Sequence, residues 1–151
     1  MLRNRFSERL KDALRSKDQR TISTVRLILA ALKDRDIAAR GRGKTDGIGE
    51  DEILQMLQTM VKQRRDAIEM YKMGQRDDLV RQEEEEIVII ESFLPKQLGE
   101  AEMDAAVAAV VAELGATGIK DMGRVMGALK ERFAGQMDFA KASAVAKRRL
   151  A

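Results

Sequence analysis

The only proline of this 151-residue chain, Pro95, constrains the fold more than any other residue. Proline lacks a backbone N–H and restricts the residue before it to extended conformations, so a helix arriving from the N-terminal side must end at about Phe93 or Leu94. A long, charge-rich stretch precedes Pro95, and a shorter stretch rich in Ala and Gly follows it. We therefore predict an N-terminal domain over residues 1–94, a hinge over residues 95–99 and a C-terminal domain over residues 100–151.

Both predicted domains have helix-forming compositions. Ala, Leu, Met, Glu, Lys and Arg are abundant, runs of β-branched residues are short, and apolar residues recur at intervals of three and four. Such spacing places apolar side chains on one side of a helix. The sequence therefore predicts an all-α fold, with a four-helix N-terminal domain followed by a small three-helix C-terminal domain.

Capping residues and glycines predict where the helices begin and end. The boundaries expected for the N-terminal helices are Leu2 to about Ser16 or Lys17, Asp18 to about Arg40, Thr45 or Asp46 to Gly74, and Asp77 or Asp78 to the stop before Pro95. Those expected for the C-terminal helices are Glu100 to Gly115, Asp121 to Gly135, and Asp138 or Ser143 onward. Four glycines within residues 41–49 predict a mobile loop between the second and third helices.

The apolar sides of the first two helices predict which residues are buried. They are Leu2, Phe6, Leu10, Ala13, Leu14, Ile22, Val25, Leu29 and Leu32, with Ile28 widening the second stripe. The tetrad Ile87-Val88-Ile89-Ile90 is apolar on every side, which predicts a helix covered on two sides. A buried strand is the alternative, but the preceding glutamates and the absence of turn residues favour a helix.

Charged residues on the third and fourth helices invite two interpretations. Arg64 lies at the edge of an apolar stripe, so we expect it to pair with Glu83, Glu84 or Glu86; a contact with nucleic acid is the alternative. The run Glu83–Glu86 cannot converge on one metal ion, because consecutive helical residues point in different directions. We therefore predict a solvated face for this acidic run.

Cysteine and histidine are both absent. Their absence excludes a disulfide, a thiolate metal site and the commonest nucleophiles and bases, so we predict no catalytic residue, no metal and no cofactor. No stretch of about eighteen apolar residues occurs, and Glu8 and Asp12 argue against a transit peptide in the Arg-rich start. We expect a soluble, cytoplasmic protein with no membrane partner.

Positive charge gathers at both ends of the chain. Residues 1–49 hold thirteen Lys or Arg against six Asp or Glu, and residues 116–151 hold eight against three. The basic residues of the C-terminal segment are Lys120, Arg124, Lys130, Arg132, Lys141, Lys147, Arg148 and Arg149. Lys and Arg neutralise phosphates, and A-form RNA is recognised largely by backbone and shape, so a basic helical face is enough for RNA binding. A solvated, solubilising surface is the alternative.

Two glycines mark one side of the sixth predicted helix. Gly123 and Gly127 lie four residues apart, where each costs about 1 kcal/mol relative to alanine. Without side chains they allow another backbone to approach closely. The approaching group is either an RNA phosphate or a neighbouring helix, and we favour the helix.

Three stretches together resemble the YqeY-like family, which shares its name with the tail domain of the B subunit of the tRNA-dependent amidotransferase, the GatB/YqeY domain. They are Lys62-Gln63-Arg64-Arg65, the run from Glu86-Ile87 through Phe93-Leu94-Pro95-Lys96-Gln97-Leu98, and Lys120-Asp121-Met122-Gly123-Arg124-Val125-Met126. The resemblance covers nearly the whole chain. It implies a helical N-terminal domain, a three-helix C-terminal domain and contact with tRNA.

That tail serves a carbon–nitrogen ligase, which converts a glutamyl or aspartyl group on mischarged tRNA to its amide with glutamine as nitrogen donor. The resemblance implies tRNA as a partner, together with an amidotransferase or aminoacyl-tRNA synthetase complex. One turn departs from the family pattern of Gly, a basic residue, Ala, Asp and Gly. Here it reads Gly135-Gln136-Met137-Asp138-Phe139, so any RNA contact made there by relatives lacks its cation in this chain.

These observations predict a tRNA-binding accessory protein. The predicted nucleic-acid-binding residues are Lys120, Gly123, Arg124, Gly127, Lys130, Arg132, Lys141, Lys147 and Arg148. We do not expect amide formation by this chain alone, because that chemistry needs an amidase nucleophile and an ATP-using centre. The alternative is a non-catalytic protein-interaction module that docks a partner through its helix faces.

Overall fold

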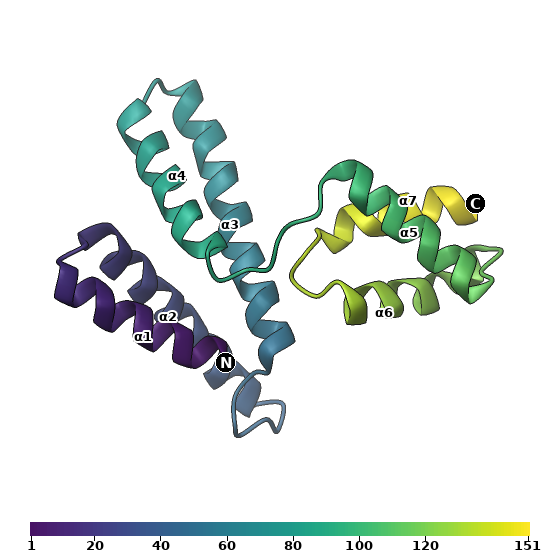
Figure 1. The fold of residues 1–151 in the computed structure, drawn as a ribbon, viewed down its shortest axis with the longest axis horizontal. Coiled ribbons are helices and arrows are strands. Elements are labelled where there is room, and N and C mark those ends of the chain that lie inside the picture. The colour runs from purple at the N-terminus through teal and green to yellow at the C-terminus, as the bar shows by residue number, and fades with distance from the viewer. The chain divides into compact units, whose positions relative to one another are not determined.

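The computed structural model describes residues 1–151 and is entirely helical, which confirms the predicted all-α class (Figure 1). It contains seven α-helices, one short 3-10 helix and no strand. The chain divides into two compact units, Met1–Leu94 and Pro95–Ala151, and each unit has its own hydrophobic core.

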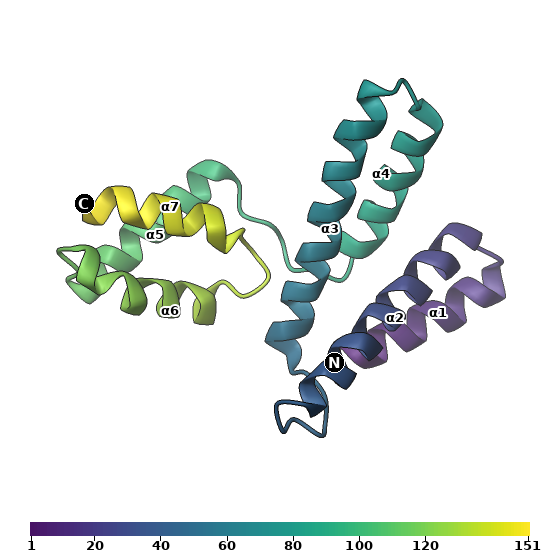
Figure 2. The ribbon, with the colours of Figure 1, turned by 180° about the vertical axis from the view of Figure 1, so that it is seen from behind.

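Two antiparallel helical hairpins form the N-terminal unit. Helices α1 (Leu2–Ser16) and α2 (Gln19–Arg40) make the first, and α3 (Glu50–Met73) and α4 (Asp77–Glu91) make the second (Figures 1 and 2). Helix α2 also packs against α4, which joins the hairpins. Asp18 caps α2 as predicted, because its carboxylate accepts a hydrogen bond of 3.2 Å from the Thr21 N–H.

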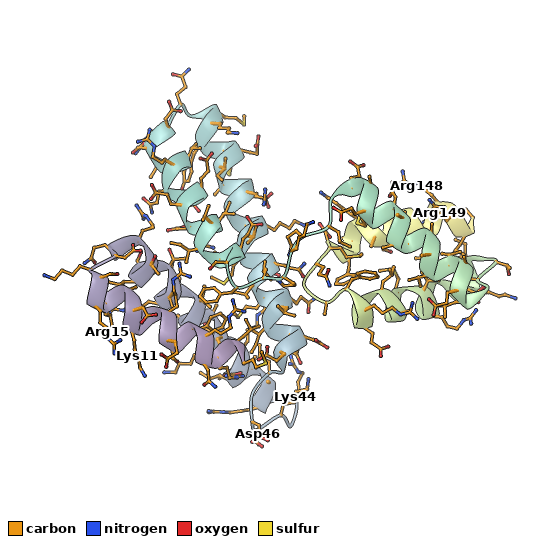
Figure 3. The ribbon with its side chains drawn as sticks, in the orientation of Figure 1. Lys11, Arg15, Lys44, Asp46, Arg148 and Arg149 are labelled. Atoms are coloured by element: carbon orange, nitrogen blue, oxygen red, sulfur yellow. The ribbon has the colours of Figure 1, made fainter.

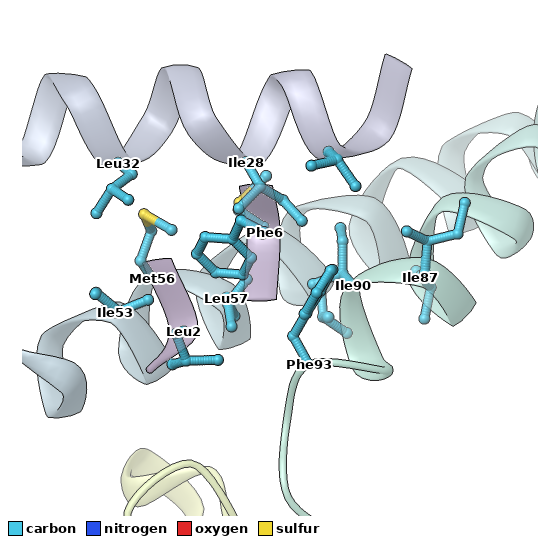
Figure 4. Close-up of a cluster of buried hydrophobic side chains, with 14 of the residues drawn as sticks. Leu2, Phe6, Ile28, Leu32, Ile53, Met56, Leu57, Ile87, Ile90 and Phe93 are labelled. Carbon is cyan, nitrogen blue, oxygen red and sulfur yellow. The ribbon is translucent and has the colours of Figure 1, made fainter. Parts of the chain in front are cut away.

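The core of this unit lies where the two hairpins meet (Figure 4). Phe6, Ile28, Leu57 and Ile90 are fully buried there. Ile28 therefore lies at the centre of the α2 stripe, where the sequence placed it at the margin. The prediction for Leu14 was wrong, since its side chain is 47% exposed near the free end of α1.

The start of α3 differs from the prediction. Neither Thr45 nor Asp46 caps the helix, which begins at Glu50 after Gly49 (the loop carries the labels Lys44 and Asp46 in Figure 3). The chain stays extended because Ile48 is buried and its N–H donates a 2.9 Å hydrogen bond to the Asp36 carboxylate. The end of the loop is thus attached to α2.

Asp36 also links this loop to α1. The Arg3 guanidinium donates to both Asp36 oxygens, at 2.8 and 2.9 Å, and to the carbonyl oxygen of Ile48 at 2.9 Å. The Arg3 hydrogen bond, aided by the Ile48 N–H, lowers the pKa of Asp36 to about 2. One carboxylate therefore connects α1, α2 and the approach to α3.

Substitution of Gly47 should disrupt this connection. Its φ is +90°, and a Cβ built there would lie 2.5 Å from Asp36 Oδ1 and 2.9 Å from Arg3 Nη2. We expect Gly47→Ala to lower the free energy of unfolding by about 1 to 3 kcal/mol in urea denaturation. Gly41→Ala is the matched control, because Gly41 has a helical backbone and should be unchanged or slightly stabilised. Equal stability of the two variants would contradict this account of the loop.

Arg64 pairs with the fourth helix as predicted. Its Nε donates to Glu86 Oε2 at 3.1 Å and lies 4.0 Å from Glu83 Oε2, and its Nη1 donates to the Met60 carbonyl oxygen at 3.1 Å. The solvated-face prediction was wrong for Glu83 and Glu86, whose side chains are only 16% and 8% exposed. Glu83 and Glu86 therefore face Arg64 of α3, whereas Glu84 and Glu85 are exposed to water.

The tetrad at residues 87–90 is helical, and the strand alternative is excluded. Ile87, Ile89 and Ile90 are buried, but Val88 is 69% exposed. The expected cover on two sides is present, because α4 packs against both α3 and α2, and Val88 lies on the side that stays exposed.

Three helices surround the core of the C-terminal unit: α5 (Glu100–Leu114), α6 (Met122–Arg132) and α7 (Phe139–Leu150), with the 3-10 helix η1 (Ile119–Asp121) before α6. Val107, Val125 and Leu129 are fully buried between them. Gly115 ends α5 at φ +62°, and the Asp138 carboxylate caps α7, both as predicted. Helix α6 ends at Arg132, before the predicted Gly135.

The turn after α6 is tied to the segment that follows Pro95. Gln97 Nε2 donates to the Gly135 carbonyl oxygen at 2.5 Å, and the Leu98 N–H donates to the Gln136 carbonyl oxygen at 2.8 Å. Met137, in the same turn, is buried in the core. The turn at residues 135–139, which departs from the family pattern, therefore helps to hold the C-terminal unit together.

Candidate nucleic-acid interface

The start of α6 fixes the position of Arg124. The Asp121 carboxylate accepts hydrogen bonds from the Thr117 and Gly118 N–H groups at 3.0 and 3.4 Å, so it closes the turn before the helix instead of capping α6 itself. The same carboxylate binds Arg124 at 2.9 Å. These bonds, led by the one from Thr117, lower the pKa of Asp121. Arg124 is thus committed to a partner within the chain.

Arg132 is also paired. Its two terminal nitrogens bind the Glu113 carboxylate of α5 at 2.5 and 2.9 Å, in a bidentate arrangement that fixes the guanidinium plane. The Arg132 guanidinium lowers the pKa of Glu113 by its hydrogen bonds and charge. Arg132 therefore joins α5 to α6, and its charge is partly neutralised before any ligand arrives.

The remaining predicted cations are exposed and form no ion pair within the chain. They are Lys120 before α6, Lys130 on α6, and Lys141, Lys147 and Arg148 on α7, with Arg149 beside them. Arg148 and Arg149 come from the last turn of α7 (Figure 3). These residues can neutralise phosphates without first breaking an intramolecular ion pair.

The glycine side of α6 is open. Gly123, Gly127 and Lys130 follow one another at helical spacings of four and three residues, so they share a side of α6. No other part of the chain lies within 4 Å of a Cβ built at either glycine. The favoured interpretation, a neighbouring helix packed on these glycines, is therefore wrong within this chain.

The structure brings only some of the predicted residues together. Lys141 and Arg148 lie seven residues apart on one side of α7, and Arg148 and Arg149 line a shallow hollow of about 310 Å³ with Asp104 and Val145. Asp104 places a negative charge in that hollow, so the hollow itself is poorly suited to a phosphate. The unpaired cations therefore lie in two places: Lys120 and Lys130 in η1 and α6, and the other four on α7.

Sequence reasoning missed the acidic partners of Arg124 and Arg132. The spacing of three residues between Asp121 and Arg124 is a local signal that predicts pairing on one side of a helix. Glu113 lies nineteen residues from Arg132, so only the packing of α5 against α6 shows that pair.

No group of three or more Asp or Glu side chains in the structure is arranged to hold a metal ion. None of the helices combines the length and the apolar character needed to cross a membrane.

Curated relatives match most of the chain. A protein of Lachancea thermotolerans named Altered inheritance of mitochondria protein 41, mitochondrial, is 35% identical over 107 residues, which cover 70% of this chain and 55% of the relative. The protein of the same name from Saccharomyces cerevisiae is 30% identical over 95 residues, which cover 63% of this chain and 49% of the relative. The chain thus spans about half the length of the curated relatives it matches.

These names overturn one expectation from the sequence. Both relatives are named as mitochondrial proteins, so the cytoplasmic location that we expected is contradicted. That expectation depended on the lack of a long apolar stretch and on the acidic residues Glu8 and Asp12 near the Arg-rich start, and neither feature distinguishes the two compartments.

The family comparison covers almost the entire chain. A family model described as "Yqey-like protein" matches residues 3–150, which include all seven α-helices except for Leu2 at the start of α1. The match spans the three stretches that carried the resemblance, and it joins both helical units in one family domain. The chain therefore belongs to the YqeY-like family.

Proposed function

We propose that this protein is a tRNA-binding accessory protein whose C-terminal unit contacts the RNA backbone. The observation that carries the proposal is the set of exposed cations without ion pairs on the C-terminal unit: Lys120, Lys130, Lys141, Lys147 and Arg148. Each can neutralise a phosphate without first breaking an ion pair within the protein. RNA helices present mainly phosphates and 2′-hydroxyls to a protein, because side chains cannot reach the base edges in their deep, narrow major groove.

The open side of α6 supports the same proposal. Gly123 and Gly127 lower the intrinsic stability of α6, and no neighbouring element of the chain occupies the space that they leave. A phosphate backbone can approach the helix closely there, with Lys130 on the same side. Arg124 and Arg132 have a different role in this proposal: they stabilise the unit through Asp121 and Glu113.

Family membership supports tRNA as the RNA. The GatB/YqeY tail that this chain resembles serves an enzyme that amidates glutamyl or aspartyl groups on tRNA. We propose a binding role within or beside such a complex, with the amide-forming chemistry performed by a partner.

Electrophoretic or fluorescence titration with total tRNA at low salt tests this proposal. We expect the combined variant Lys120→Ala, Lys130→Ala, Lys141→Ala, Arg148→Ala to bind about tenfold more weakly or worse, because fewer cations remain to neutralise the phosphates. The control variant is Arg26→Ala, Lys33→Ala, Arg40→Ala, Arg81→Ala. It removes four exposed cations of the N-terminal unit that also lack ion pairs.

The two variants change the net charge equally, so a general charge effect would weaken both alike. Selective weakening of the C-terminal variant supports the proposed interface. Equal weakening, or no detectable binding by the unmodified protein at low salt, would overturn it.

A further inference from the structure

The hairpin of α3 and α4 carries a groove on its surface. The groove has a volume of about 490 Å³, and Ile68, Ile87 and Val88 form its apolar part. Ile68 and Ile87 are each only 7% exposed, whereas Val88 is 69% exposed. A valine this exposed on an ordered helix leaves apolar surface in water that a partner can cover.

The two walls of the groove have matching helical spacing. Arg65, Ile68, Glu69 and Lys72 follow one another along α3 at positions i, i+3, i+4 and i+7, and Glu84, Ile87, Val88 and Glu91 do the same along α4. Each set is therefore a single ridge along its helix, and the groove runs between two antiparallel ridges. A third helix fits such a groove, because helices pack by placing a ridge of side chains between the ridges of others.

The charges of the lining select the partner. Both basic residues of the groove are already paired with acids of the same groove, Arg65 with Glu91 at 3.5 Å and Lys72 with Glu69 at 4.0 Å. The two other acids, Asp66 and Glu84, have no ion pair in the structure. The uncompensated charge of the groove is therefore negative.

We propose that this groove binds a cationic amphipathic helix of a partner protein, with apolar residues against Ile68, Ile87 and Val88 and Lys or Arg beside Asp66 and Glu84. A second copy of the same groove is a poor partner, because two acidic rims would face each other. This inference concerns the N-terminal unit and does not depend on the proposed RNA interface.

Designed peptides test the proposal with the full chain. The first peptide is a helix of roughly 15 residues with Leu at i, i+3, i+4 and i+7 and Lys at the flanking positions. In the second, every Lys is replaced by Glu; in the third, the Lys content is kept but the Leu residues are moved off the common side. We expect the first peptide to bind about tenfold more tightly than either of the others, measured by fluorescence anisotropy.

Two charge-matched variants locate the site. Val88→Asp places a carboxylate in the apolar part of the groove and should weaken binding of the first peptide about tenfold or more. Met70→Asp changes a residue of the same hairpin that is similarly exposed, at 72%, and lies outside the groove. It should bind like the unmodified protein, and circular dichroism of both variants verifies that the helices persist.

A third variant tests the charge term separately. Asp66→Asn combined with Glu84→Gln leaves the apolar part of the groove intact. This double variant should bind the Lys peptide more weakly, and the difference between its affinities for the Lys and Glu peptides should be smaller than in the unmodified protein. Three results would overturn the proposal: no binding of the Lys peptide, equal binding of the Lys and Glu peptides, or equal affinity in Val88→Asp and Met70→Asp.

Discussion

Phe93→Ala is expected to lower the free energy of unfolding of the N-terminal unit by about 3 to 5 kcal/mol, the usual cost of removing a buried aromatic ring. The Phe93 ring is 3% exposed and meets Phe6 edge to face, with 4.8 Å between ring centroids. The guanidinium carbons of Arg5 and Arg9 lie 5.5 and 5.9 Å from the ring centroid. The ring therefore joins the start of the chain to the end of the second hairpin.

The hydrogen bonds around Phe93 increase the expected loss. Arg5 donates to the carbonyl oxygens of Ser92 and Phe93 at 3.0 and 3.4 Å, which satisfies backbone groups at the end of α4. Loss of the ring removes the surface that positions Arg5. Urea unfolding followed by circular dichroism measures the effect, and Phe139→Ala, at a half-buried site of the other unit, serves as the control. A loss below about 1 kcal/mol for Phe93→Ala would contradict this packing.

Arg64→Met is expected to destabilise the same unit by about 3 to 5 kcal/mol, because it leaves buried carboxylates without their nearest cation, and the other cation, Arg20, lies 4.0 Å from Glu86. The side chains of Arg64 and Glu86 are 13% and 8% exposed, and their atoms lie 3.1 Å apart. Glu83 lies at the same site, where burial and the nearby Glu86 charge raise its pKa. Without Arg64 the two acids would repel each other in a desolvated position.

A second substitution distinguishes the destabilisation caused by an unpaired buried charge from the net contribution of the Arg64–Glu86 ion pair to stability. We expect Arg64→Met combined with Glu86→Leu to recover most of the lost stability, because an apolar pair needs no buried counter-charge. Arg65→Ala is the control, since Arg65 pairs with Glu91 at the surface and should cost less than about 1 kcal/mol. If the double variant were as unstable as Arg64→Met, Glu86 would not be the principal partner.

Local signals were sufficient to predict most of the fold. Caps and glycines act within a few residues, so the boundaries at Asp18, Gly115 and Asp138 could be read from the sequence. The start of α3 could not, because Ile48 is held by Asp36 from α2 and by Arg3 from α1. Contacts between residues so far apart in sequence leave no periodic signal.

Local signals were also insufficient for the two proposed surfaces, the basic surface of the C-terminal unit and the groove between α3 and α4. Composition identified the basic C-terminal residues but did not separate the paired arginines from the free lysines; spacing could have indicated the Arg124 pair, whereas only the folded structure shows the Arg132 pair. Similarly, the tetrad at 87–90 is apolar throughout, and only the packing shows which of its residues remains exposed. Val88 faces water because α2 packs on a different side of α4 from the groove.

The salt dependence of tRNA binding tests the central proposal most directly. The logarithm of the association constant should fall linearly with the logarithm of salt concentration, because binding of phosphates by Lys and Arg releases counterions. For the C-terminal variant of Lys120, Lys130, Lys141 and Arg148 we predict a slope shallower by about 1 for each phosphate that the variant no longer neutralises. The N-terminal control variant should keep the slope of the unmodified protein. Identical slopes for all three proteins would contradict an RNA interface on the C-terminal unit.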